Sequence, residues 1–133
     1  MEAIVDSKYY KINFIKEVPC INIQWFGLPP TEEFQKGCNA VLDLIVSKKV
    51  SKVLTDNRYA KVFSVADRRW LNEEWLVRAE KAGYRSSAVV YSDSETFIRY
   101  AVDSIVQERD SSKFISKHFQ DFDQAVEWLK TLP

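Results

Sequence analysis

Four polar residues near the ends of two expected strands are the best candidates for ligand chemistry. Asp56, Asn57 and Arg58 follow one short apolar run, and Ser92 follows another. In an open parallel sheet, ligands bind beyond the carboxyl ends of the strands, and a helix N-terminus beside an arginine can hold an anion. The sequence therefore predicts a small site for an anionic ligand. The alternative is structural: Asp56, Ser92 and Asp121 would form turns and caps, with Arg58 paired to a carboxylate.

The sequence offers little of what a catalytic or metal site requires. The single histidine, His118, has no cysteine or second histidine near it, whereas a zinc site needs several such ligands. Cys38 falls on the apolar face of an expected helix, where a thiol behaves as a small hydrophobic group. With only three glycines in the chain, no glycine-rich phosphate loop occurs. We therefore expect no enzymatic activity, no metal and no cofactor, and we expect Cys20 and Cys38 to be reduced and buried.

The helix expected at 65–82 has apolar residues on two opposite sides. At about 100° per residue, one side carries a core-facing stripe of Leu71, Trp75, Ala79 and Ala82. The opposite side carries Ala66, Trp70 and Val77, flanked by Arg69 and Arg78. Because Trp and Arg are enriched at the centres of interfaces, this outer side is predicted to contact a protein partner or a second copy of the chain. Alternatively, the 57–63 loop would fold over Trp70.

Periodicity along the chain predicts the elements that position these residues. Strands are expected at 9–16, 20–26, 52–56, 86–91 and 113–119, with a turn at 17–19 between the first two and a loop at 57–61. Helices are expected from the N-cap Thr31 to about Lys49, at 65–82 between Ser64 and Gly83, from Ser92 to about Gln107, and after Asp121. The order β-β-α-β-α-β-α-β-α predicts an α/β fold. Its sheet would be five-stranded, mixed and mostly parallel, with a leading antiparallel hairpin.

Composition excludes several classes of protein. The 133 residues correspond to one domain, 1–133, and a hydrophobic content of 46% suffices for a core without disulfides. Nineteen basic residues balance nineteen acidic ones, so the basic surface typical of nucleic-acid-binding proteins is absent. Neither a basic-then-apolar leader nor an apolar run of about 20 residues occurs. We therefore expect a cytoplasmic protein that does not bind nucleic acid or insert stably into membranes.

Four ordered segments resemble the STAS domains of anti-sigma-factor antagonists. They are VSKVLTDNR at 50–58, WLNEEWL at 70–76, AVVYS at 88–92 and FDQAVEWL at 122–129. With the leading hairpin, the likeness covers nearly the whole chain. It is strongest to small stand-alone bacterial STAS-like proteins, most of which have no assigned activity, and it implies a regulatory protein partner.

The chain departs from this family at the phosphorylation site. The antagonists carry a phosphorylatable serine in a turn after the strand that corresponds to 52–56. Here the turn reads Asp56-Asn57-Arg58-Tyr59, so Asp56 matches but the serine and the turn glycine are missing. We therefore expect no phosphorylation switch of the family kind.

Two hypotheses of function follow. The first is a non-catalytic STAS-like interaction or regulatory module that forms a homodimer through the outer side of the 65–82 helix. The second is a small carrier or sensor that holds an anionic or lipid-like ligand near Asp56, Arg58, Trp70 and Trp75. The lipid-carrying CRAL-TRIO domains, which share the α/β architecture, suggest the lipid-like ligand. A large apolar cavity behind the helix would favour the carrier, and a flat Trp70 surface buried in a symmetric contact would favour the module.

Overall fold

A single mixed sheet organises the computed structural model, which describes residues 1–61, 63–92 and 114–133. Its described strands are β1 (Glu2–Asp6), β2 (Tyr10–Ile15), β3 (Cys20–Gly27), β4 (Lys52–Ala60), β5 (Ser86–Val90) and β6 (Ile115–Phe119). They lie side by side in chain order. The pairs β1–β2 and β2–β3 are antiparallel, and the pairs from β3 to β6 are parallel. The predicted α/β class and mixed sheet are confirmed, with six described strands instead of five.

The additional strand is β1, which the sequence pattern does not predict. It pairs with β2 at the edge of the sheet, and its register shifts between Ala3 and Val5. Only Ile4 and Val5 are half-buried in it. Because an edge strand of this kind buries so little apolar surface, it lacks the regular alternation that marks β2 and β3.

The second difference concerns residues 57–61, where the predicted loop is wrong. Strand β4 continues through this segment to Ala60 and pairs with β3. Gln24 lies opposite Asp56 and Phe26 lies opposite Tyr59, so β4 has one more residue than β3 across this stretch. Such a bulge keeps two strands paired while it redirects side chains. The polar run Asp56-Asn57-Arg58 therefore belongs to a strand and not to a turn.

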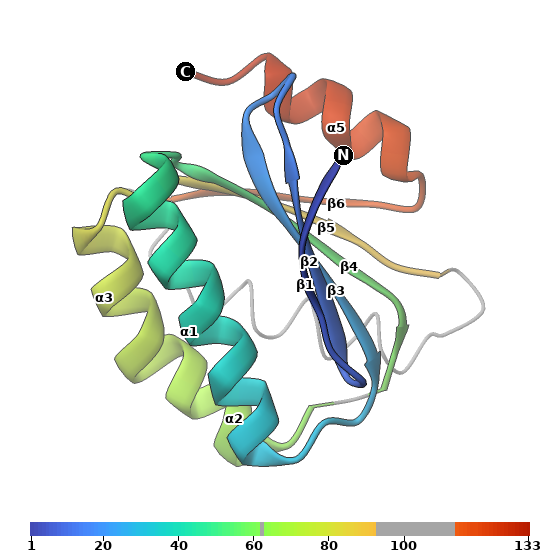
Figure 1. Cartoon of the computed structure of the whole chain (residues 1–133), viewed down its shortest axis with the longest axis vertical. Coiled ribbons are helices and arrows are strands. Elements are labelled where there is room, and N and C mark those ends of the chain that lie inside the picture. The colour runs from blue at the N-terminus through green and yellow to red at the C-terminus, as the bar shows by residue number, and fades with distance from the viewer. Residues whose placement is uncertain (62, 93–113) are drawn as a thin grey trace.

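Helices cover both faces of the sheet (Figure 1). They are α1 (Thr31–Lys48), α2 (Val65–Trp70), the π-helical turn η1 (Leu71–Trp75), α3 (Leu76–Lys81) and α5 (Phe122–Lys130). Helices α1, α2 and α3 lie on one face, and α5 lies on the other. The helix predicted from Ser92 to about Gln107 falls almost entirely outside the described residues. None of the described helices is long and apolar enough to cross a membrane.

Two of the three predicted N-caps whose helices lie in the described residues are confirmed. Ser64 accepts a hydrogen bond from the backbone N–H of Asp67, and Asp121 accepts one from that of Gln124. Thr31 is not a cap: Pro30 holds that position. The Thr31 hydroxyl instead donates to Asp67 Oδ1 at 2.9 Å, which ties the start of α1 to α2.

The segment predicted as one regular helix at 65–82 contains the π-helical turn. The backbone N–H of Leu76 donates to Leu71 O, five residues earlier, in place of the usual four. Leu71, Trp75 and Ala79 of the predicted core stripe are buried, and Leu76 is buried with them. Ala82, the fourth residue of the stripe, is half-buried. The wider turn brings an additional side chain to the sheet.

The sheet separates two hydrophobic cores. The larger lies between β2–β4 and helices α1–α3, and the smaller lies between the sheet and α5. Cys38 belongs to the larger core and Cys20 to the smaller, and both are free and buried. This confirms the prediction of reduced, buried thiols, because the sheet stands between them.

Candidate functional site

The sheet divides the four residues predicted to form one polar site. Asn57 lines a cavity on the face covered by α1–α3. Arg58 lies over the ring of Phe122 in α5, at 5.6 Å from the ring centroid, and binds Asp56 on that opposite face. Ser92 is half-buried just beyond β5. These residues therefore do not converge on a single pocket.

Asp56 and Arg58 form a bidentate ion pair. Arg58 Nη2 lies 2.7 Å from Asp56 Oδ2, Arg58 Nε lies 2.9 Å from Asp56 Oδ1, and the Arg58 backbone N–H also donates to Oδ1. The hydrogen bonds to Asp56 raise the pKa of the Arg58 guanidinium above its usual value. The arginine is thus paired to a carboxylate, as the structural interpretation expected. An anion at this position would have to displace Asp56.

The remaining polar candidates at this edge of the sheet have structural contacts. Asp121 caps α5, and the His118 ring packs edge-on against Tyr91 with centroids 5.6 Å apart. Within the described part of the chain, no three histidine, cysteine, aspartate or glutamate side chains are grouped to hold a metal. Burial raises the pKa of the Cys20 thiol to about 12, so this thiol stays protonated at neutral pH.

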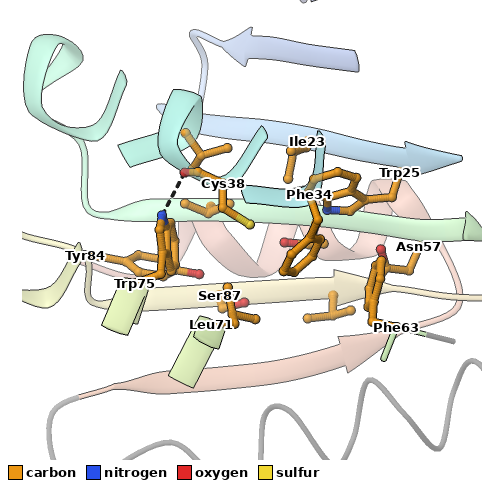
Figure 2. A pocket seen from close by; sticks show the side chains of 14 residues that line it. Ile23, Trp25, Phe34, Cys38, Asn57, Phe63, Leu71, Trp75, Tyr84 and Ser87 are labelled. Atoms are coloured by element: carbon orange, nitrogen blue, oxygen red, sulfur yellow. Dashed lines mark hydrogen bonds between the residues drawn. The ribbon is translucent and has the colours of Figure 1, made fainter. Parts of the chain in front are cut away.

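The other face of β4 borders a cavity of about 70 Å³ (Figure 2). Aromatic side chains from separate parts of the chain surround it: Trp25, Phe34, Phe63, Trp75 and Tyr84. Their rings are in contact, with centroids 5.2 Å apart for Trp25–Phe34 and 5.1 Å apart for Phe34–Phe63. The cavity lies between the sheet and η1, since Leu71 and Trp75 of η1 line it.

Helix α1 lies close to β3 at this cavity because Gly37 has no side chain. A Cβ atom at Gly37 would be 2.6 Å from Cη2 of Trp25, well inside contact distance. Glycine inside a helix costs about 1 kcal/mol relative to alanine, so its presence reflects this close approach. Trp25 is thereby held between α1 and the sheet and forms one wall of the cavity.

Three polar side chains from the sheet also face the cavity. Thr55 and Asn57 come from β4, and Ser87 comes from β5. Asn57 is only 3% exposed, and its Oδ1 accepts no hydrogen bond from any residue that the structure describes. The indole N–H of Trp75 is already used, because it donates to Cys38 O at 2.8 Å. Asn57 Oδ1 is therefore a buried acceptor without a donor among the described residues, on a residue that lines a mainly apolar cavity.

Sequence reasoning named Asn57 and Trp75 but missed the other cavity residues. The available signal was the alternation of Val53, Thr55 and Asn57 along β4, which places all three on one face. Polar residues at strand positions that face the core indicate a buried polar site. The pattern was missed because the predicted strand ended at Asp56 and so did not include Asn57.

The predicted partner surface is only partly exposed. Ala66, Arg69, Val77 and Arg78 are exposed, whereas Trp70 is half-buried and packs against the larger core. The Trp70 ring meets Phe34 edge-on, with centroids 6.2 Å apart. Phe34 thus covers part of the side chain that was expected to point outward.

Comparison with known proteins supports the fold. No family model and no curated protein matches the chain. A solved structure that is similar to it is an uncharacterised protein of the DUF3478 family with a SpoIIAA-like fold, from Shewanella loihica PV-4. The similarity has a TM-score of 0.63 at 14% sequence identity and covers 95% of this chain and 99% of the other. The chain therefore has a SpoIIAA-like α/β fold, which confirms the STAS-like architecture that the sequence resembles.

Proposed function

We propose that this protein binds a small neutral ligand in the cavity between the sheet, α1 and η1 and acts as a non-catalytic carrier or sensor. The observation that carries the proposal is the cavity itself, a mainly apolar space walled by aromatic rings and supplied with a few polar groups. Ligand sites in proteins typically have this composition. The π-helical turn at the cavity is a second supporting feature, because such turns are frequent at functional sites.

The lining and the volume restrict the ligand. None of the described lining residues is charged, and an unpaired charge is costly to bury, so the cavity favours a neutral molecule over the anionic ligand expected from the sequence. Its 70 Å³ is roughly half of an engineered cavity of about 150 Å³ that holds benzene. A ligand of roughly three to five heavy atoms fits this space on that scale.

Xenon is a suitable first probe because it enters apolar cavities without needing hydrogen bonds. Under xenon pressure, we expect NMR shifts in the methyl groups of Val53 and Val89, which line the cavity. Leu71→Trp should abolish these shifts by filling the space. Leu28→Trp adds the same ring at an exposed position and should preserve them.

Absence of xenon-induced shifts in the wild type would refute the proposal, and so would their persistence in a folded Leu71→Trp variant. Native mass spectrometry of the purified protein then identifies a ligand that co-purifies with it. A neutral mass small enough for the cavity is the expected result.

A second candidate function is self-association through the exposed side of α2–α3. Val77 is 47% exposed there, and the same side carries both basic and acidic residues, including the Arg69–Glu73 ion pair. A helix face with both charge signs around an apolar centre can complement itself in a two-fold contact. This observation favours a second copy of the chain as the partner.

Sedimentation tests the dimer. If the face associates, the wild type should sediment as a dimer at micromolar concentration, and Val77→Glu should sediment as a folded monomer because it places unpaired charge on both sides of the contact. Val46→Glu makes the same change at an exposed position of α1 and should remain dimeric. A monomeric wild type would eliminate this candidate.

A further inference from the structure

We infer that the ligand of this cavity donates a hydrogen bond, from a neutral N–H or O–H group, to Oδ1 of Asn57. The inference rests on the proposed function and specifies the chemical class of the ligand. The ligand would be a small neutral molecule with one donor group and an otherwise apolar body that packs against the aromatic walls.

The position of Asn57 supports a role in binding. Asn57 follows Val53 and Thr55 on the α1–α3 face of β4, while its two neighbours pair with each other near α5. Figure 2 shows Asn57 beside Phe63, at one end of the set of aromatic side chains. The alternation of side chains along the strand thus separates the amide from the ion pair and brings it to the cavity.

The hydrogen bonds around the cavity leave Asn57 Oδ1 without a donor among the described residues. The indole N–H of Trp75, which also lines the cavity, donates to Cys38 O. Most buried polar atoms in proteins have a partner, so each exception calls for an explanation. An apolar side chain would suit this inward position of β4 better if packing were its only role. A donor group on a bound ligand accounts for the amide.

Two ring compounds of equal size, one with a donor group and one without, measure how much the hydrogen bond contributes to affinity. Pyrrole has an N–H donor, whereas furan has none, and both are neutral five-membered aromatic rings. We expect the wild type to bind pyrrole about 5- to 10-fold more tightly than furan, the ratio typical of one added hydrogen bond in a buried site. NMR titration of the cavity methyl groups gives both dissociation constants.

The Asn57→Leu variant should remove the preference and leave the cavity intact. We expect it to bind pyrrole and furan equally and to retain the xenon-induced shifts. Its thermal midpoint without ligand should rise, because the substitution removes an unpaired buried acceptor. Asn39→Leu, the same change on α1 outside the cavity lining, should keep the wild-type preference for pyrrole. Asn57→Val provides a second variant if Asn57→Leu does not fold.

The outcomes separate this inference from the proposed function. Equal binding of pyrrole and furan by a wild type that takes up xenon would overturn the donor inference alone. Failure of the wild type to take up xenon, pyrrole or furan would overturn the proposed function. A lower thermal midpoint for Asn57→Leu would show that the amide has a partner within the protein, and this too would overturn the inference.

Discussion

Replacing Trp75 by alanine is expected to lower the free energy of unfolding by about 3–5 kcal/mol, the usual range for removing a buried tryptophan. Trp75 is 4% exposed, and its ring meets Tyr84 edge-on with centroids 5.8 Å apart. Its indole N–H donates to the backbone oxygen of Cys38 in α1. The substitution therefore removes apolar packing, enlarges the existing cavity and leaves a buried carbonyl without this donor.

Urea unfolding measures this loss, with Trp128→Ala as the matched control. Trp128 is a half-buried residue of α5 and packs against Phe119 on the opposite face of the sheet. The same atoms are deleted there with less loss of burial, so we expect a clearly smaller effect. A loss below about 1 kcal/mol for Trp75→Ala would contradict the assignment of Trp75 to the core.

The periodicity of the sequence was sufficient to predict most of the fold. Alternation in β2 and β3 placed Ile21, Ile23 and Trp25 on one face, and all three pack in the larger core. Ser64 and Asp121 marked two helix starts because a capping side chain acts within its own turn, so the signal is local. Thr31 has the same chemistry, but it bonds to Asp67, which lies 36 residues away in the sequence. Local rules do not capture a contact of that kind.

The candidate site was less predictable because β4 continues past its predicted end and the helical segment contains a π-helical turn. The bulge at Asn57–Arg58 keeps β4 paired with β3 across a polar run. Ordinary alternation along the strand then places Asn57 on one face and the Asp56–Arg58 pair on the other. The π-helical turn changes the spacing between Trp70 and the buried residues that follow it. Both features insert one residue into a regular pattern, and a calculation at constant periodicity does not detect them. The predicted polar site is divided because the expected loop is a strand, in which successive side chains point to opposite faces.

Replacing Arg58 by leucine is expected to destabilise the protein by about 3 kcal/mol, the lower end of the range for breaking a buried ion pair. Asp56 is 2% exposed and accepts two side-chain hydrogen bonds from Arg58. Without the guanidinium, the buried carboxylate would keep the backbone N–H of residue 58 as its one donor among the described residues. Because the Arg58 side chain is 35% exposed, water can partly replace it, and this places the loss at the lower end.

Replacing Asp56 instead of Arg58 provides the control, because Asp56 is buried and Arg58 is partly exposed. Asp56→Asn leaves a neutral side chain in the protein interior and a partly exposed guanidinium that water can solvate, so we expect it to cost less than Arg58→Leu. In the double variant, no buried charge remains, and its total loss should be smaller than the sum of the single losses. Urea unfolding of the four proteins gives this coupling free energy. Additive losses would show that the ion pair contributes no stability and would leave Arg58 available to an anionic ligand, as the sequence first suggested.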